Sequence, residues 1–221
     1  MKSIQRESSC PAFDRYRFSV NDDESCSLVD WFCDWFEAAV VDCAQLASGQ
    51  RLQLGWSLLQ IECDGRSLQI RAPDFKSFPL AWSDNLSNAL QLLAYHKYVP
   101  ESYRLQADIP SLEDTALVGE RFEQPPMFMT RSDKDADSGH SGWFIASLSS
   151  EVDNTDTAKL KMMSLYEVFI TAPHVLEYLS MPPGTQVVFE TGTPVVFERN
   201  RELAPVAGSL VAERQQTAKH V

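Results

Sequence analysis

Apolar residues in the first part of the chain recur with a helical spacing. A short strand is expected at residues 16–20, and from residue 28 onward apolar side chains return every three or four positions, which predicts an amphipathic helix. Ser27 is the expected N-cap of this helix, and Gly49 is expected to end it. Its predicted buried face consists of Trp31, Phe32, Trp35, Phe36, Ala39, Val40, Cys43 and Leu46.

Beyond this helix the apolar positions alternate, as in a half-buried strand. Alternation over residues 52–58 is followed by alternation of the opposite parity over residues 59–63, which predicts a bulge or bend near Leu58. The Asp-Gly pair at residues 64–65 predicts a tight turn. Apolar residues at alternate positions over residues 68–72 then complete a predicted hairpin.

A second helix is predicted from an N-cap at Ser83 to the residue before Pro100. His96 lies near its end, where a charged imidazole would complement the helix dipole. Residues 99–125 contain several prolines and no sustained period, so the domain boundary is placed there. The predicted parts are an N-terminal α+β domain of unknown role at residues 1–110, a second domain at residues 111–200 and a flexible tail at residues 201–221.

The second domain is also expected to combine strands and helices. Apolar runs predict strands at residues 127–129 and 143–148, and Pro173 suits the first turn of a helix. A terminal hairpin is predicted within residues 187–197, whereas residues 160–169 fit a helix or a strand equally well. The fold class predicted is α+β, with two small domains that each pack a short, largely antiparallel sheet against one or two helices.

The charge of the chain is strongly negative, with a formal value of −12. This argues against a nucleic-acid ligand, because neutralising phosphates needs a basic surface. Residues 113–156 alone hold ten acidic and three basic side chains, hence −7, which fits either a solvated surface or an acidic binding face. No signal peptide and no run of 18 apolar residues is found, so we expect a cytoplasmic protein without a membrane partner.

The five cysteines lie in the first third of the chain, but no pair has the two-to-four-residue spacing of a zinc knuckle. Small buried hydrophobic side chains are therefore the preferred interpretation of all five. No cofactor is expected.

The segment DKDADSGHSGW at residues 133–143 is the part least explained by folding alone, since it places acids, glycines, a histidine and a tryptophan before a buried strand. Asp133, Asp135 and Asp137 match the first three ligand positions of a calcium loop. Ser138 replaces its glycine and Phe144 its bidentate glutamate, so an EF-hand is not predicted. A looser divalent-ion site stays open.

The same segment has the residue types of a hydrolase triad in Asp137, Ser138, His140 and Ser141, but neighbours in one loop rarely reach triad geometry. No other catalytic motif occurs, so a binding function is favoured over an enzyme. A metal-dependent hydrolase that uses Asp133, Asp135, Asp137 and His140 remains the main alternative. The candidate partner-binding residues are Asp133, Asp135, Asp137, Ser138, His140, Trp143, Glu151, Asp153 and Asp156.

Residues 128–197 resemble the immunity-protein family 33 domain. The matching features are DSG and SGW within residues 137–143, an acidic spacer, and a proline-led helix ending in Tyr178-Leu179, followed by a Pro-Pro-Gly turn and a strand ending in Phe189-Glu190. The family pattern is a compact DSGW, whereas residues 139–141 here separate the aspartate from Gly-Trp. The resemblance implies an inhibitor that blocks a cognate toxin delivered between bacteria, for example by type VI secretion.

An acidic face suits such an inhibitor, because long-range attraction accelerates encounter with a basic toxin. If the toxin is a nuclease, carboxylates near residues 133–137 could occupy its phosphate site, while affinity would come from a few buried anchors. A third interpretation is a secretion adaptor or chaperone, which would need the Trp31 to Phe36 face exposed; we expect it buried. Self-association as a homodimer is left open.

Overall fold

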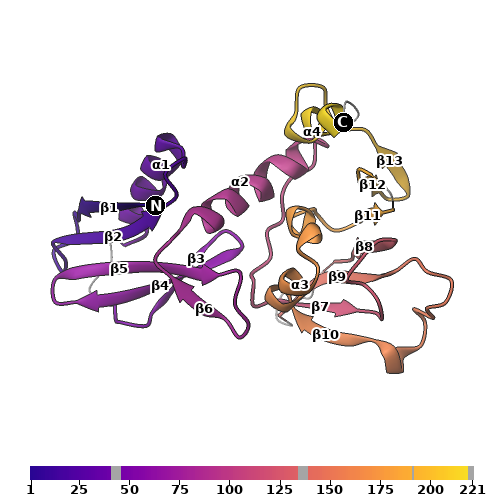
Figure 1. The fold of residues 1–221 in the computed structure, drawn as a ribbon, viewed down its shortest axis with the longest axis horizontal. Coiled ribbons are helices and arrows are strands. Elements are labelled where there is room, and N and C mark those ends of the chain that lie inside the picture. Colours follow the sequence, from indigo (N-terminus) through magenta and orange to yellow (C-terminus); the bar gives the residue numbers. More distant parts are fainter. Residues whose placement is uncertain (41–45, 134–138, 191, 219–221) are drawn as a thin grey trace. The chain divides into compact units, whose positions relative to one another are not determined.

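The computed structural model describes residues 1–40, 46–133, 139–190 and 192–218 (Figure 1). The chain divides into two compact units, Met1–Leu93 and Ala94–Val221. Each unit contains one mixed sheet with helices, which confirms the predicted α+β class. No helix in these four ranges combines the length and the apolar character needed to cross a membrane.

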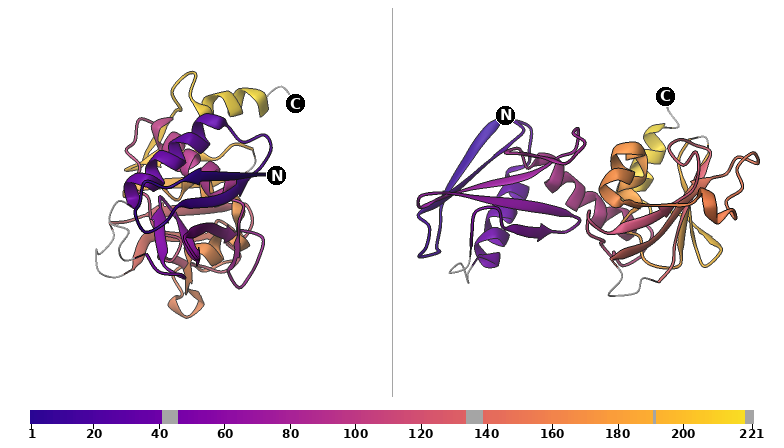
Figure 2. Two further views of the ribbon diagram at one scale, coloured as in Figure 1. Left: turned by 90° about the vertical axis from the view of Figure 1, so that its left-hand side faces the viewer. Right: turned by 90° about the horizontal axis from the view of Figure 1, so that it is seen from below.

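The N-terminal unit is built on a six-stranded sheet with the order β1-β2-β5-β4-β3, and β6 pairs with β5 (Figures 1 and 2). Four of its five strand pairings are antiparallel, and β2 with β5 is parallel. The strands are β1 (Lys2–Glu7), β2 (Arg15–Val20), β3 (Arg51–Leu54), β4 (Ser57–Asp64), β5 (Ser67–Asp74) and β6 (Ala81–Ser83).

Helix α1 (Cys26–Ala39) packs on this sheet through Phe32 and Phe36, both fully buried beside the rings of Phe18 and Tyr16. The expected aromatic core is therefore confirmed, except that Trp31 is 44% exposed. Ala39, also expected on the buried face, is exposed. Trp31 lies one residue, about 100°, away from the buried stripe of the helix. The helix begins after Ser25 instead of Ser27 and ends at Ala39, earlier than expected; residues 41–45 lie outside the described ranges.

Two local expectations for this unit are wrong, and two strands were not predicted. The apolar pattern changes parity near Leu58 because a tight turn joins β3 to β4, with Leu54 paired to Ser57. The predicted bulge within one strand is therefore wrong. Ser83 belongs to β6, and helix α2 (Ser87–Glu101) begins later and includes Pro100. Strands β1 and β6 were not predicted, because their sequences show no clear alternation and only pairing with a neighbour makes them strands.

The cysteine interpretation holds only in part. Cys33 is buried, as expected, but Cys26 is exposed and Cys10 is disulfide-bonded. A spacing in sequence cannot reveal a thiol's distance from another thiol, and that distance decides whether a disulfide can form.

The C-terminal unit contains a seven-stranded sheet with the order β10-β7-β9-β8-β11-β12-β13 (Figure 1). Only β7 with β9 is parallel. The strands are β7 (Thr115–Val118), β8 (Met127–Arg131), β9 (His140–Ser147), β10 (Lys161–Ser164), β11 (Thr185–Phe189), β12 (Val195–Glu198) and β13 (Arg201–Leu203).

The C-terminal unit also contains several helical elements. These elements are the end of α2, the short 3-10 helix η2 (Thr157–Lys159), α3 (Leu165–Thr171), the 3-10 helix η3 (Pro173–Tyr178) and α4 (Leu210–Ala218). η3 packs against the inner strand positions, because the Tyr178 ring lies 5.5 Å from that of Phe189. The ambiguous residues 160–169 contain both β10 and the start of α3, where Ser164 and Glu167 form a capping box.

His96 is fully buried, and its Nε2 lies 2.8 Å from the Leu176 carbonyl. Burial lowers the pKa of His96 to about 4, so the expected charged imidazole is wrong: the ring is neutral at pH 7. Residues after position 200 also differ from the expected tail, since β13 pairs with β12 and Val211 of α4 is buried. The predicted domain boundary near residue 110 stays a prediction; the division of the chain between Leu93 and Ala94 falls within α2.

Candidate functional site

The connection between β8 and β9, residues 132–139, is the part of the sheet singled out by the sequence. Asp133 is exposed there, and His140 is half-buried at the first position of β9. The predicted site residues Asp135, Asp137 and Ser138 lie outside the described residues. The structure therefore places the start and the end of this connection.

Backbone geometry explains the Ser141-Gly142 pair. Gly142 has φ +84°, and a Cβ at this position would lie 2.2 Å from the Ser132 carbonyl oxygen, so only glycine fits. Ser141 is buried, and its hydroxyl donates to the Thr115 carbonyl at 2.8 Å. The His140 Nδ1 accepts from the Gly142 N–H at 2.9 Å. These residues fix the chain as it enters β9.

Trp143 is fully buried, and its indole N–H donates to the Leu179 carbonyl at 2.9 Å. A partner protein cannot reach this side chain on the folded surface. Its place among the partner-binding candidates is therefore corrected: Trp143 supports the connection from inside the core, by anchoring the end of η3.

Arg131, at the end of β8, is the buried charge that the sequence analysis missed. Only 2% of it is exposed, and its guanidinium donates to the carbonyls of Ser141 (3.0 Å), Asp108 (2.6 Å) and Met181 (2.6 Å). The Asp108 carboxylate lies 3.4 Å away, and the guanidinium carbon lies 5.6 Å from the centre of the Trp143 ring. Burial lowers the pKa of Arg131, whereas the charge of Asp108 raises it.

A sequence signal for Arg131 did exist. Met127, Met129 and Arg131 occupy the same parity of β8, and both methionines are fully buried. A strand that places an arginine at an inward position must supply acceptors for it, because an unpaired buried charge is too costly. Here those acceptors are carbonyls from three separate chain segments, and no local pattern could have predicted them.

The other acidic candidates lie in the connection from β9 to β10. Glu151 is exposed and pairs with Arg121 at 2.8 Å. Asp153 accepts from the Thr155 hydroxyl at 2.6 Å and the Thr155 N–H at 2.9 Å, which lowers the pKa of Asp153. Asp156 caps η2 by accepting from the Ala158 N–H. All three carboxylates thus lie on the surface of one ordered turn.

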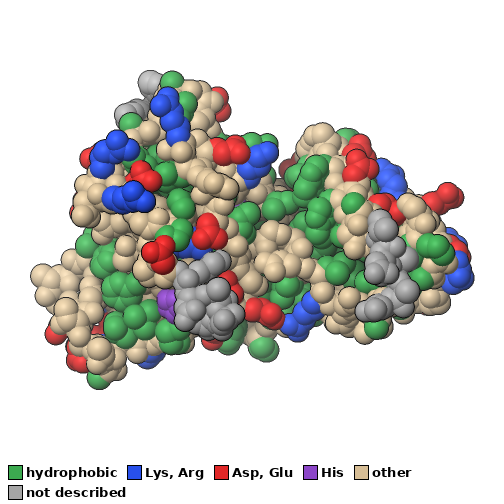
Figure 3. Space-filling view, turned by 180° about the vertical axis from the view of Figure 1, so that it is seen from behind, with side chains coloured by type: hydrophobic (Ala, Val, Ile, Leu, Met, Phe, Trp, Pro, Cys, Tyr) green, Lys and Arg blue, Asp and Glu red, His purple; other side chains and the backbone are tan. Residues whose placement is uncertain are grey.

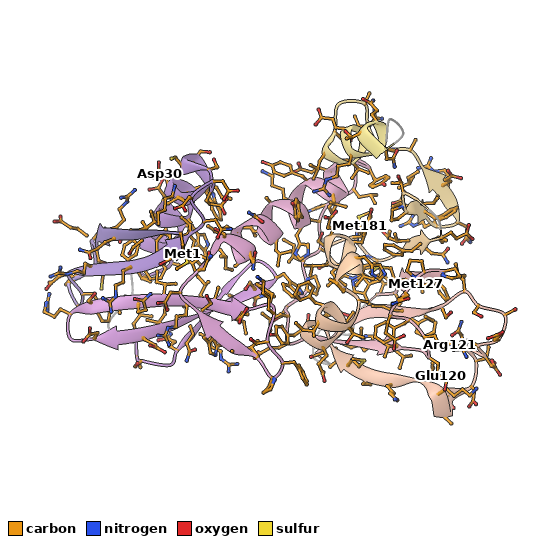
Figure 4. All side chains as sticks on the ribbon, viewed as in Figure 1. Met1, Asp30, Glu120, Arg121, Met127 and Met181 are labelled. Carbon is orange, nitrogen blue, oxygen red and sulfur yellow. The ribbon has the colours of Figure 1, made fainter. Side chains whose placement is uncertain are left out.

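The two acidic groups lie at opposite ends of the sheet. The first connection ends at His140, the second starts after Ser147, and β9 runs between them for about 23 Å. In Figure 4, Glu120 and Arg121 mark the end with the β9–β10 connection, while Met181, which accepts from Arg131, lies at the other end. The predicted residues therefore do not form one compact site.

The arrangement suits binding to a surface more than chemistry on a small substrate. Within the described ranges, no three His, Cys, Asp or Glu side chains come together as metal ligands. Exposed carboxylates in connections that a buried core holds in place are typical of recognition loops on a rigid scaffold.

A sheet-based α+β unit with acidic connections at both ends is thus the class of structure that carries the candidate residues. The family model described as Imm33-like domain matches residues 96–198, from the second half of α2 through β12. This match confirms the resemblance seen in the sequence for that segment. Searches of curated proteins and of solved structures found no match.

Proposed function

We propose that this protein is an immunity protein, which binds a cognate antibacterial toxin and blocks its active site. The Imm33-like match over residues 96–198 is the observation that carries this proposal. An immunity domain implies a protein partner, and the protein would act in the cytoplasm of the cell that makes the toxin.

The charge distribution suggests how the partner is captured. Acidic connections at both ends of the C-terminal sheet would attract a basic toxin over a range of about 8–10 Å at physiological salt. Such steering raises the association rate and disfavours acidic partners, whereas affinity depends on buried contacts. Glu151, Asp153 and Asp156 at one end, and Asp133, Asp135, Asp137, Ser138 and His140 at the other, are the proposed contributors.

Two finer features belong to the same proposal. The toxin is delivered between bacteria by a type VI secretion apparatus, and it is a nuclease, whose phosphate-binding site is basic and would accept carboxylates. The acidic connections support a basic partner of this kind. The protein itself would perform no catalysis.

Co-expression tests the function directly. The product of the neighbouring gene is expressed in a sensitive bacterial host with and without this protein, and survival is measured together with co-purification of a complex. We expect survival and a complex of fixed stoichiometry. Continued killing without a complex would contradict the proposal.

Charge steering has a separate test. The association rate of the purified pair is measured by stopped flow between 50 and 500 mM salt, concentrations chosen to span Debye lengths from about 14 to about 4 Å. We expect a steep fall with salt for the wild type and a shallower one for Asp153→Asn with Glu151→Gln. A rate independent of salt would remove steering but leave inhibition intact.

A further inference from the structure

The two sheets of this protein differ in the face that their helices leave open. In the N-terminal unit the outward positions of β2, β4 and β5 are polar. Arg71 pairs with Glu62 at 2.7 Å, and Arg17 donates to Gln69 at 2.5 Å. This is the usual solvated face of an antiparallel sheet.

In the C-terminal unit the corresponding positions carry an apolar stripe, beside polar positions such as Thr130 and Gln186. The strand register places Met162 opposite Leu117, Leu117 beside Phe144, Phe128 opposite Val188, and Val188 opposite Val195. The rings of Phe128 and Phe144 meet edge to face, with centres 5.8 Å apart. We call these six residues the outer sheet face: Leu117, Phe128, Phe144, Met162, Val188 and Val195.

The outer sheet face is accessible. Met162 is 54% and Val195 37% exposed, and the other four side chains are half-buried. The inner positions, such as Met127 and Phe189, contact η3 through His174, which identifies the opposite side as the one that the helices cover. Figure 3 shows hydrophobic side chains gathered at the surface in the lower part of this unit.

Its size fits the centre of a protein interface. The stripe crosses six strands, about 24 Å, and four residues along a strand span about 13 Å, which gives a footprint of roughly 300 Å². The largest apolar patch on a typical monomer is of this size and is often functional. A stable interface buries about 800 Å² on each partner, so the surrounding surface must supply the remainder.

The surrounding surface is acidic. Three connections leave the strands at the same end of the sheet: residues 119–126, 148–160 and 190–194. Together they hold six acidic and two basic side chains, hence a formal charge of −4. At the opposite end, the exposed Asp133 adds a further carboxylate. An apolar centre with a charged rim is typical of a protein-binding surface. The negative charge of this rim favours a basic partner.

We infer that the outer sheet face is the toxin-docking surface, and that its partner presents an apolar patch within a basic surface; this inference rests on the proposed function. Phe128 and Phe144 lie at the centre, where water is excluded and contacts contribute most to affinity. The described acidic candidates, Asp133, Glu151, Asp153 and Asp156, form the rim. They determine the rate of encounter, while the outer sheet face determines how long the complex lasts.

The test compares three full-length proteins in binding to the product of the neighbouring gene. Met162→Lys with Val195→Lys places positive charges on exposed outer positions, where they oppose a basic partner. Phe128→Thr with Phe144→Thr removes the central rings. Ser3→Lys is the matched control, since it adds a lysine to an exposed strand position of the N-terminal sheet, in the register of Ser19.

We expect Kd to rise at least about tenfold for the lysine pair and about 30-fold or more for the phenylalanine pair, mainly through faster dissociation. The control should bind like the wild type. Circular dichroism melting verifies folding, and if the phenylalanine pair does not fold, the lysine pair, on exposed positions, decides the question.

Four outcomes separate the ideas. If the wild type binds and the lysine pair weakens binding, the inference stands. If the wild type and a folded lysine pair bind equally, the docking surface is wrong while the immunity function survives. If the wild type neither binds nor protects, both fail. If light scattering shows a dimer of this chain that the lysine pair dissociates, the face joins two copies and the inference is overturned.

Discussion

Replacing Arg131 with methionine tests whether the buried guanidinium holds the C-terminal unit together. Methionine keeps the length and the apolar stem of the side chain but removes every donor. The carbonyls of Ser141, Asp108 and Met181 then lose hydrogen bonds of 3.0, 2.6 and 2.6 Å. These carbonyls belong to three chain segments that the guanidinium joins.

The expected cost follows from these contacts. A hydrogen bond to a charged group contributes about 1.5–3 kcal/mol, and removing one partner of a buried ion pair costs about 3–5 kcal/mol. Asp108 is about one-third exposed, so water can solvate its carboxylate after the substitution. The loss of unfolding free energy is therefore expected near the lower end of the sum of the three hydrogen-bond contributions. We expect destabilisation by about 3–5 kcal/mol, which lowers the melting temperature of this unit by roughly 10–15 °C.

Urea denaturation and hydrogen exchange over residues 179–185 measure the effect. Arg121→Met is the matched control, because Arg121 forms an exposed ion pair with Glu151, and such a pair contributes less than about 1 kcal/mol. Arg131→Lys should fall between the two, since an ammonium group cannot span three carbonyls. If Arg131→Met and Arg121→Met unfold within 1 kcal/mol of each other, a structural role for the guanidinium is refuted.

Three further predictions concern single positions. Gly142→Ala should cost several kcal/mol more than Gly139→Ala, because both residues have positive φ but only the first would place a Cβ against backbone; equal urea midpoints would contradict this. Stability should fall as pH drops from about 6.5 toward 4, by roughly 3 kcal/mol at most, because the unfolded chain binds a proton that buried His96 does not. His96→Gln should flatten this dependence between pH 6.5 and 5, where carboxylates titrate little; an unchanged slope would exclude the histidine. Phe32→Ala should cost about 3–5 kcal/mol and Trp31→Ala less than 1, although the two are neighbours in α1 and both were expected in the core; similar thermal shifts would show that Trp31 is buried in solution.

The strands that form the outer sheet face carry a pattern in the sequence that indicates an apolar surface. Residues 127–129, 143–146 and 195–197 are apolar at both parities, whereas a strand with one solvated face normally alternates. Such a pattern indicates either burial on both sides or an apolar surface. Charge, in contrast, is visible in any sequence, and the acidic residues that it marks lie at the rim of the proposed surface.

Local patterns were sufficient for the class of fold and for most of the helices and strands. Apolar spacing of three and four predicted α1, and alternation predicted β4 and β5, because one buried side imposes its period on the residues that face it. Continuous apolar runs predicted β8 and β9. The family-like order of motifs in the second half was also readable, and residues 96–198 match that family model.

Tertiary structure alone decided the rest. Strand β1 exists because β2 supplies its hydrogen bonds, and β7 pairs with β9 although β8 lies between them in the chain. Arg131 is stable only because carbonyls far apart in sequence converge on it. The same holds for the separation of the two acidic groups by the length of β9. Periodicity reports which side of an element is buried, but register and strand order, set by contacts between remote segments, determine which residues share a surface.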